Sequence, residues 1–399
     1  MTNVEFDPFS ETYFNDPTEM YRGLRDHAPL YYSEKYDFYA LSRYDDVVQA
    51  SRDTTTFTST HGLTYDMLSD PDYEIGNQLS MIMMDPPDHT RYRRLVARAF
   101  SPRYIEEREP MVRELMAEYL DPLMDRSEFD LVHDFTGPFP VEVICAILGI
   151  PKADRQAIRH NTDISLTRES GSGGMGQAQM DAAVATGMYF YQFIADKRNH
   201  LADDMCSALI TAEIETESGE KATLSDVDIA GFLTLLAAAG SETVTKAVAN
   251  AGVLFHRWPG EWDKIKADPS KIPNAVEEVL RYWAPSQYQG RFSTRDTTWY
   301  DQTLPAGKPV FLITGSANHD PREYDDPERF AVDRAQKMGI TFGHGIHACI
   351  GAALARLEIR VAIDELRVRW PNYRVDESRC ERVHMSNVAG YSSVPLHTA

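Results

Sequence analysis

The stretch FGHGIHACIGAALARLE, from Phe342 to Glu358, decides the interpretation of this chain. Gly343 and Gly345 precede Cys349, and a helical pattern of apolar residues begins at the cysteine itself. A thiol at a helix N-terminus has its thiolate favoured by free amide groups and by the positive end of the helix dipole. The pattern therefore predicts that Cys349 is an anionic ligand or a nucleophile, although a lone cysteine is ordinarily a small core residue.

Composition narrows the class of protein. The chain has 399 residues, 43% hydrophobic and 25% charged, which is typical of a soluble globular protein. Its formal net charge of -21 argues against nonspecific binding to nucleic acid or anionic lipid. The 4 scattered cysteines form neither a disulfide framework nor a CxxC metal site, so a reducing cytoplasm is expected. No signal peptide and no apolar run of ~20 residues is visible, so we expect neither export nor a membrane anchor.

The organisation of the chain favours one domain over residues 1–399, because no repeat and no linker-like tract interrupts it. Helical periodicity dominates, and the exception is a small hairpin that turns at Glu34 and Lys35. A further helix is expected between about Asp85 and Phe100. The glycine-rich segment 169–177 is predicted to be a loop, either a lid or a surface insertion.

The longest predicted helix begins at the N-cap Ser225, with Asp228 placed for a capping box, and runs to about Phe255. Its apolar residues cover most of its circumference, so it should be a buried central helix. The run from Gly240 to Thr243 interrupts this pattern, and a buried carboxylate there costs several kcal/mol unless it is paired or hydrated. Taken alone, the run equally fits a kinked helix with one solvated edge.

The cysteine loop resembles the haem-binding loop of the cytochrome P450 family. The family pattern F-G-x-G-x-[HR]-x-C-x-G is matched by Phe342, Gly343, Gly345, His347, Cys349 and Gly351. The resemblance extends over essentially the whole chain. It implies a mainly α single-domain cytochrome P450 fold with small β-sheets, and haem b with Cys349 as its axial thiolate.

Two further motifs follow in the order that the family has them. The run from Ala239 to Thr243 resembles the oxygen-binding groove, A-G-x-[DE]-T, which implies that Glu242 and Thr243 are an acid-alcohol pair that manages protons. In the same comparison, the small Ala239 and Gly240 leave room for oxygen. Glu242 stands where aspartate is more usual.

The ExxR motif is matched by Glu278 and Arg281, which as an isolated pattern would be an ordinary i,i+3 surface pair. The segment PERF, from Pro327 to Phe330, resembles the family segment whose arginine joins this pair. The resemblance therefore implies a buried structural triad that includes Arg329.

The resemblance also assigns partners to the haem propionates. The segment DPPDHTRYRR resembles the family helix whose His89 and Arg93 hold these groups, and Arg291 and His347 match two further partners. Two carboxylates in a low-dielectric pocket require charged or polar donors. His347 occupies a place that arginine often holds.

The implied activity is monooxygenation, the insertion of one oxygen atom from O2 into a hydrophobic small molecule such as a lipid, steroid or terpenoid. Mostly apolar walls with a few polar anchors are expected around the substrate. The substrate-facing residues implied by the resemblance are Leu63, Met67, Met81, Leu235, Gln287, Val388 and Tyr391.

Electrons must come from a separate protein, because the chain has no flavin domain. The basic residues expected near the thiolate side of the haem are Arg91, Arg94, Arg98, Arg356 and Arg360. We expect this face to dock an acidic ferredoxin, which a ferredoxin reductase would supply with electrons. The alternative is that these arginines lie scattered on solvated helix faces.

Other classes of function remain open at this point. A haem-thiolate sensor or binding protein without turnover needs the Cys349 loop but not Glu242 and Thr243. A cofactor-free carrier of apolar ligands would explain the buried helices but not the ordered motifs. A peroxide-driven peroxygenase typically lacks the acid-alcohol pair.

Overall fold

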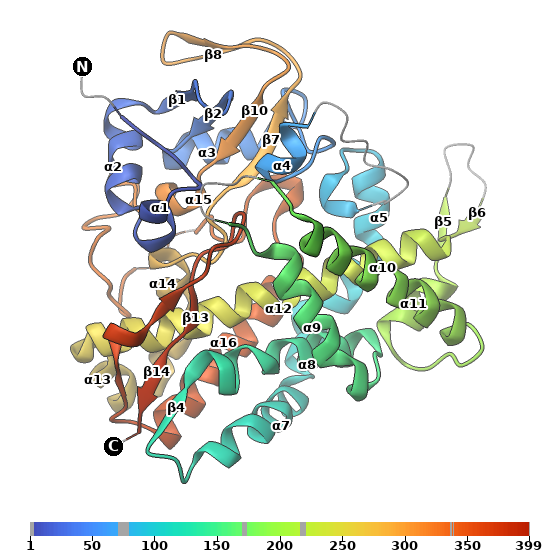
Figure 1. The fold of residues 1–399 in the computed structure, drawn as a ribbon, viewed down its shortest axis with the longest axis vertical. Helices are drawn as coiled ribbons and strands as arrows, with labels where there is room; N and C mark the ends of the chain where they lie inside the picture. The colour runs from blue at the N-terminus through green and yellow to red at the C-terminus, as the bar shows by residue number, and fades with distance from the viewer. Residues whose placement is uncertain are drawn as a thin grey trace.

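The computed structural model describes residues 4–70, 80–169, 174–215, 221–335, 337 and 339–398. It confirms the predicted mainly α fold with small sheets (Figure 1). The α-helices are α1 (Glu11–Asn15), α2 (Thr18–His27), α3 (Tyr44–Arg52), α4 (Tyr65–Leu68), α5 (Asp88–Ala97), α6 (Pro102–Glu106), α7 (Glu109–Leu120), α8 (Pro138–Leu148), α9 (Lys152–Leu166), α10 (Gln177–Lys197), α11 (Met205–Thr211), α12 (Asp226–Arg257), α13 (Pro259–Ala267), α14 (Ile272–Tyr282), α15 (Thr314–Ala317) and α16 (Ala352–Arg369). The strands are β1 (Leu30–Ser33), β2 (Phe38–Leu41), β3 (Phe57–Thr58), β4 (Glu128–Asp130), β5 (Glu213–Glu215), β6 (Lys221–Thr223), β7 (Gln289–Ser293), β8 (Thr297–Trp299), β9 (Gln302–Leu304), β10 (Pro309–Leu312), β11 (Arg374–Val375), β12 (Glu381–Arg382), β13 (Tyr391–Ser393) and β14 (Pro395–His397).

The largest described sheet joins the beginning of the chain to its second half. Its strand order is β1-β2-β10-β7-β3, and β10 runs parallel to β2 but antiparallel to β7. The predicted hairpin is present, with Leu30 opposite Leu41 and a turn over residues 34–37. Strand β7 carries Arg291 into the interior, so this sheet positions one of the predicted site residues.

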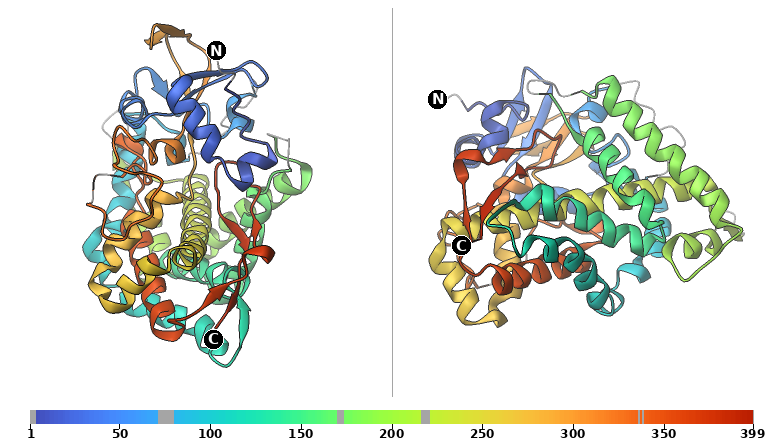
Figure 2. Two further views of the ribbon diagram at one scale, coloured as in Figure 1. Left: turned by 90° about the vertical axis from the view of Figure 1, so that its left-hand side faces the viewer. Right: turned by 60° about the horizontal axis from the view of Figure 1, so that its bottom comes forward.

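Helix α12 forms the centre of the molecule and is seen along its axis in the left view of Figure 2. Its capping box is formed as predicted: the Asp228 amide donates to the Ser225 hydroxyl at 3.1 Å, and the Ser225 amide donates to the Asp228 carboxylate at 2.9 Å. The helix continues without interruption to Arg257. The Ser241 hydroxyl donates to the Ala237 carbonyl of the same helix, which satisfies a buried polar group.

Two helical stretches are long and apolar enough to cross a membrane, residues 131–148 and α12. Most residues of both windows are buried in the protein, 83% and 56% respectively. Both stretches are therefore core helices of this fold, since a central helix passes the same test of length and composition.

The other predicted elements differ from expectation only at their ends. The expected helix after Asp85 begins at Asp88 and its last turn, residues 98–100, is a 3₁₀ helix. Of the glycine-rich loop, residues 170–173 lie outside the described part of the chain, so the lid hypothesis stays untested.

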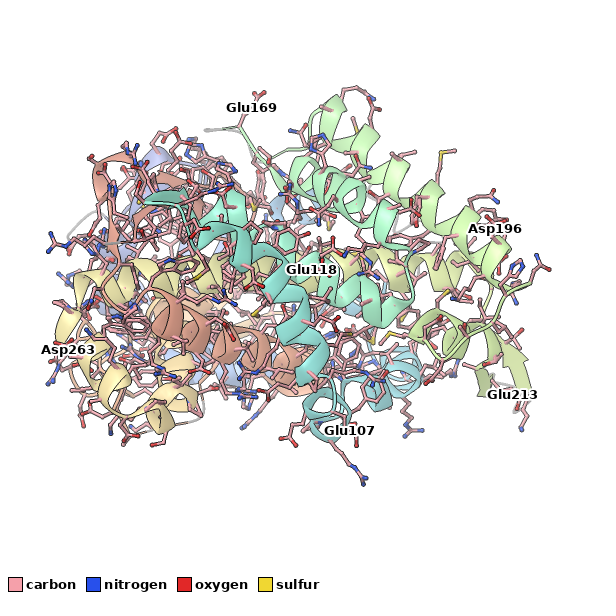
Figure 3. The ribbon with its side chains drawn as sticks, turned by 90° about the horizontal axis from the view of Figure 1, so that it is seen from below. Glu107, Glu118, Glu169, Asp196, Glu213 and Asp263 are labelled. Atoms are coloured by element: carbon pink, nitrogen blue, oxygen red, sulfur yellow. The ribbon has the colours of Figure 1, made fainter. Side chains whose placement is uncertain are left out.

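The negative charge of the protein is spread over its surface. In the view of Figure 3, the exposed carboxylates of Glu118, Asp196, Glu213 and Asp263 come from α7, α10, β5 and α13. Glu107, directly after α6, is also exposed. These carboxylates lie on separate elements, so any local basic surface is an exception to the surrounding field.

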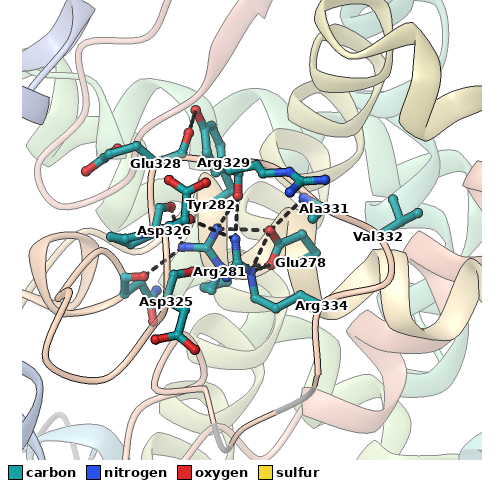
Figure 4. Close-up of polar contacts among 12 residues, drawn as sticks. Glu278, Arg281, Tyr282, Asp325, Asp326, Glu328, Arg329, Ala331, Val332 and Arg334 are labelled. Atoms are coloured by element: carbon teal, nitrogen blue, oxygen red, sulfur yellow. Dashed lines mark hydrogen bonds and ion pairs between the residues drawn. The ribbon is translucent and has the colours of Figure 1, made fainter.

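The structure corrects the predicted triad around Glu278. Arg281 holds this buried carboxylate through Nε at 2.8 Å and Nη2 at 2.9 Å, and the second arginine is Arg334, whose Nε lies 3.1 Å from both carboxylate oxygens (Figure 4). Arg329 contributes only its backbone carbonyl, which accepts from Arg281 and from Arg334. The Arg329 side chain is exposed, so its assignment to the triad was wrong.

The path of the chain explains why Arg334, and not Arg329, reaches Glu278. After Arg329, the backbone turns inward and the Ala331 amide donates to Glu278 at 2.9 Å. Arg334 then reaches back over the same turn and donates to the carbonyls of Asp325 and Asp326. A single arginine therefore pins both the carboxylate and the loop that follows α15.

We predict that Arg334→Gln destabilises the protein far more than Arg329→Gln. Glu278 is 1% exposed, and removal of one partner of a buried ion pair costs on the order of 3 kcal/mol. Arg329→Gln keeps the backbone carbonyl and should change stability by less than about 0.5 kcal/mol. The free energy of unfolding, measured in urea by circular dichroism, checks both values, and equal losses in the two variants would contradict the assignment.

Candidate active site

One internal cavity collects most of the predicted site residues. It is bounded by α5, α12, β7, the loop before α16 and the first turns of α16. The predicted residues that line it are His89, Arg93, Ala239, Gly240, Thr243, Arg291, Phe342, Gly343, His347, Cys349 and Gly351, together with Leu63, Met81 and Leu235. Segments more than 250 residues apart in the chain thus meet at one site, because the central helix and the sheet bring them together.

The loop that carries Cys349 is closed on itself. The Cys349 amide donates to the Phe342 carbonyl at 2.7 Å, and Gly343 and Gly345 have φ angles of +71° and +69°. These left-handed conformations favour glycine. At Gly345, a Cβ atom would also lie 2.5 Å from the carbonyl oxygen of Ser51, so α3 packs directly against this turn.

The helix after the loop begins later than the sequence suggested. Helix α16 starts at Ala352, with Gly351 as its N-cap, so Cys349 lies just before the helix and not in its first turn. Burial raises the pKa of the Cys349 thiol, while the Gly351 amide, Arg93 and Arg356 act in the opposite direction. The amide of Gly351 supplies the local hydrogen bond that the helix terminus was expected to provide, and a bound metal cation would add the charge that deprotonates a coordinating thiol.

Four basic side chains face the same cavity, and none forms an ion pair within the part of the chain that the structure describes. His89 and Arg291 are buried, and the rings of His89 and His347 lie 4.3 Å apart. Burial lowers the pKa of Arg291 to about 10, and burial together with Arg291, His89 and Arg93 lowers the pKa of His347 to about 3. Arg291 is therefore still a cation at neutral pH, whereas His347 is a neutral imidazole, and neither group has a nearby anion that would raise its pKa.

The neighbouring acid does not supply that anion. Asp85 already accepts from the Thr58 hydroxyl and, at 3.1 Å, from the Ser59 amide. Among the described residues, no carboxylate lies within ion-pair distance of His89, Arg93, Arg291 or His347. The buried Nε2 atom of His89 has no hydrogen-bond partner in the same part of the chain.

These features fit a haem group. Two propionates require hydrogen-bond donors and positive charge: the two histidines can donate, and the two arginines add the charge. An iron requires an axial ligand, which the Cys349 thiol can provide. Positive-φ glycines beside the cysteine keep the loop free of side chains on that wall. The residues present therefore suit an iron porphyrin with two carboxylates.

The wall formed by α12 carries Ala239 and Thr243. The Thr243 hydroxyl donates to the Ala239 carbonyl at 3.0 Å, so in this structure it bonds back to its own helix. Gly240 serves packing: a Cβ atom there would lie 2.9 Å from Cγ1 of Ile144 on α8. The expectation that Gly240 only leaves room for oxygen is therefore incomplete, since close contact between α12 and α8 itself requires glycine.

Glu242 precedes Thr243 but does not line the cavity. Its carboxylate is 4% exposed and lies 3.1 Å from the ammonium group of Lys246, one turn further along α12. Burial alone would raise the pKa of Glu242, and the nearby Lys246, Asp163 and Arg159 outweigh it, so the net shift is downward. An ionised carboxylate is thus stabilised directly behind the cavity wall.

The remaining predicted substrate residues lie elsewhere. Gln287 accepts from the Tyr21 hydroxyl at 2.7 Å and donates to the Ala284 carbonyl, which commits both ends of its amide. Gln287 and Tyr391 line a separate cleft in which Arg382 stacks over the Tyr391 ring at 4.0 Å. Met67 and Val388 are also absent from the cavity lining. The structure thus does not bring these four residues to the site.

Several cavity residues were not found from the sequence. Ile144 on α8 and Ile82 before α5 come from segments that carry no motif, and Val244 is one apolar residue among many on α12. The partner of Glu242 did leave a signal, because Lys246 stands four residues later on the same helix.

The predicted basic residues near the cysteine are mostly paired. Arg91 contacts Asp88 at 3.2 Å, Arg356 contacts Glu277 at 2.5 Å, and Arg360 contacts Glu109 at 2.6 Å. Arg94 is exposed and has no ion pair among the described residues. The side chain of Arg98 lies outside that part of the chain.

The fold and the site together define a haem-thiolate protein, mainly α, with an apolar cavity beside the thiolate loop. Comparisons with known proteins agree. The family model described as Cytochrome P450 matches residues 272–366. A putative cytochrome P450 123 of Mycobacterium tuberculosis is 41% identical over 98% of this chain and 96% of its own length, and cytochrome P450 130 of the same species is 38% identical over 99% of each. The crystal structure of CYP109E1 from Bacillus megaterium in complex with testosterone has a TM-score of 0.88 at 30% identity, over 96% of this chain and 98% of that one.

The chain belongs to the cytochrome P450 family. It is a monooxygenase that uses haem b.

Proposed function

We propose that this enzyme inserts one oxygen atom from O2 into a lipid-like, steroid or terpenoid molecule that binds in the cavity beside α12. The observation that supports the proposal is that a thiol, four basic side chains and Thr243 line one cavity whose other walls are mostly apolar. Leu63, Met81 and Leu235 contribute to those walls. Apolar walls with few polar groups favour a hydrophobic substrate, and one of the similar structures, CYP109E1, was solved with testosterone.

Each residue has a role in this proposal. Cys349 binds the haem iron as a thiolate, and His89, Arg93, Arg291 and His347 hold the propionates. Haem, when bound, supplies the activation of O2. Phe342, Gly343, Gly351, Ala239 and Gly240 form the walls against which the cofactor lies, and these walls exclude water from the reacting centre.

The protein's own chemistry is proton transfer. Rotation of the Thr243 hydroxyl away from the Ala239 carbonyl, 3.0 Å distant, would let it donate a hydrogen bond into the cavity. Glu242, adjacent in the chain and ionised beside Lys246, accepts a proton on one side of the wall and releases it on the other. The pair can therefore bring protons to the cavity at Thr243.

The same proposal includes a separate ferredoxin, with its reductase, as electron donor and places the enzyme in the cytoplasm. Arg94 lines a surface hollow together with Arg93 and Gly345, on the outside of the loop that carries Cys349. Arg91, Arg356 and Arg360 are neutralised by carboxylates, so Arg94 carries uncompensated charge on this face. On a molecule of net charge -21, such a spot is suited to steer an acidic partner.

We predict that the ferrous protein under carbon monoxide shows the red-shifted Soret band of thiolate ligation, and that Cys349→His abolishes it. Only Cys349 combines the glycine loop with a position on the cavity. Cys380→Ser is the matched control, because the Cys380 thiol faces the Asp376 carbonyl away from the haem cavity and its loss should leave the band unchanged. A band of histidine-ligated type in the wild-type protein would refute both the ligand and the proposed activity.

Thr243→Ala should retain haem and the Soret shift caused by apolar ligands, but should lower the yield of product per electron by about tenfold. That is the effect of one lost hydrogen bond of ~1.4 kcal/mol. Thr243→Ser keeps the hydroxyl and should retain coupling. Thr245→Ala, which removes a hydroxyl that donates to the Thr136 carbonyl at 2.7 Å, controls for packing. Unchanged coupling in Thr243→Ala would mean that the hydroxyl serves only its own helix.

Arg94→Glu is predicted to slow ferredoxin-supported reduction several-fold at low salt and to weaken its dependence on ionic strength. Like charges slow encounter, and salt screens both the attraction and its reversal. Arg22→Glu, on the distant α2, is the matched control for the change in net charge. Equal rates for Arg94→Glu and wild type at every salt concentration would place the docking surface elsewhere and leave the haem site unaffected.

A further inference from the structure

A second carboxyl group contacts Glu242. Asp163, near the end of α9, lies within hydrogen-bonding reach of the Glu242 carboxylate across the interface of α9 and α12. On the other side of Glu242, Oε2 lies 3.1 Å from Lys246 Nζ but accepts no aligned hydrogen bond among the described residues. Two carboxyl groups and one ammonium group therefore form a cluster directly behind Thr243.

The two carboxyl groups differ in their access to water. The Asp163 side chain is 34% exposed, whereas that of Glu242 is 4% exposed. Arg159, one turn earlier on α9 and 32% exposed, lies 3.1 Å from Asp163 and marks the outer end of the cluster. The order from solvent inward is thus Arg159 and Asp163, then Glu242, then the cavity at Thr243.

The cluster favours one shared proton. Two carboxylates in contact cannot both ionise without strong repulsion. Burial and then Glu242 raise the pKa of Asp163 to about 8, against the opposing charges of Arg159 and Lys246. Glu242 is the ionised member because Lys246 lies against it, and the pair titrates as a unit. At neutral pH the outer group therefore holds the proton and the inner group can accept it.

We propose that Asp163 is the proton-uptake residue of this enzyme, which takes a proton from solvent and passes it to Glu242 for delivery at Thr243. In this step the O–H bond of Asp163 breaks, an O–H bond forms on Glu242, and water protonates Asp163 again. Asp163 acts through Glu242 and touches no substrate. The inference rests on the proposed function, since it requires that Glu242 serves the cavity.

A purely structural role is the competing explanation. The contacts of Asp163 with Arg159 and Glu242 could simply hold α9 against α12. Such a role would affect stability. It would not make the turnover rate depend on pH near the pKa of the carboxyl pair, and it would not make proton transfer part of the rate-limiting step.

Three variants separate the two roles. Asp163→Asn removes the transferable proton at nearly constant shape, Asp163→Glu restores a carboxyl group, and Arg159→Gln removes only the outer charge. Asp154→Asn is the matched control: Asp154 lies on the same helix and accepts from the Tyr189 hydroxyl at 2.8 Å, away from Glu242. The first readout is the infrared absorption of protonated carboxyl groups in the resting protein. A band that titrates near pH 8 should be present in wild type and Asp154→Asn and absent in Asp163→Asn.

The second readout is turnover with a saturating reductant. Wild-type turnover should fall as pH rises through about 8, because the pair then loses its proton. Asp163→Asn should slow turnover at least tenfold and raise the solvent isotope effect. It should also abolish this limb of the pH profile, that is, the decrease in turnover above about pH 8, and leave the substrate-induced Soret shifts unchanged. Asp163→Glu should recover most of the rate. In Arg159→Gln the limb should move to higher pH, because loss of a neighbouring cation raises the pKa of Asp163.

The outcomes are distinct from those that test the proposed function. If Glu242→Gln turns over more slowly while Asp163→Asn matches wild type in rate, isotope effect and pH profile, this inference is overturned and the role of Glu242 stands. If Asp163→Asn is merely less stable and the pH limb persists, the contact is structural and the inference is again wrong. If Glu242→Gln itself has normal turnover and coupling, the failure lies in the proposed function.

Discussion

The site depends on one electrostatic constraint: two arginines and two histidines gather at a single cavity, and no carboxylate in the described part of the chain forms an ion pair with them. Arg291 enters from β7 and His89 and Arg93 from α5, while the nearby Asp85 is held by Thr58 and Ser59. Isolated buried charge is expensive, so a fold retains such an arrangement where an external anion completes it. In the proposed function the haem propionates provide that anion, and the rest of the architecture brings the basic side chains, the thiol and α12 together.

Local sequence predicts the features that local geometry determines. Gly343 and Gly345 adopt left-handed conformations, and Ser225 with Asp228 forms its capping box, because backbone conformation and short-range hydrogen bonds fix both. The start of α16 was placed too early, at Cys349, because apolar periodicity does not show where the backbone becomes helical. The beginning of that helix depends on the closed turn between Phe342 and Cys349.

Features that depend on the path of the chain could not be predicted in the same way. Arg329 and Arg334 stand five residues apart with the same charge, and only the inward turn at Ala331 decides which one reaches Glu278. Gly240 needs to be glycine because Ile144, almost 100 residues earlier, packs against it. Gln287 lies in the segment after α14, close in sequence to residues that line the cavity. Its amide nevertheless accepts a hydrogen bond from Tyr21 in another cleft. Such contacts join segments that carry no shared pattern.

Three buried glutamates show how surroundings assign different roles to the same side chain. Glu278 contacts two arginines, and together they hold a loop in place. Glu358 on α16 lines the haem cavity with neither oxygen partnered among the described residues, and burial raises its pKa well above the ordinary value. It is therefore neutral, so the neighbouring arginines determine the electrostatic field on the cysteine's side of the cavity. Glu242 differs from both, because Lys246 and the adjacent Asp163 favour its anion while the pKa of Asp163 is raised beside it. An ionised carboxylate beside a proton-bearing carboxyl group can accept that proton and pass it on, which is the property that proton delivery requires.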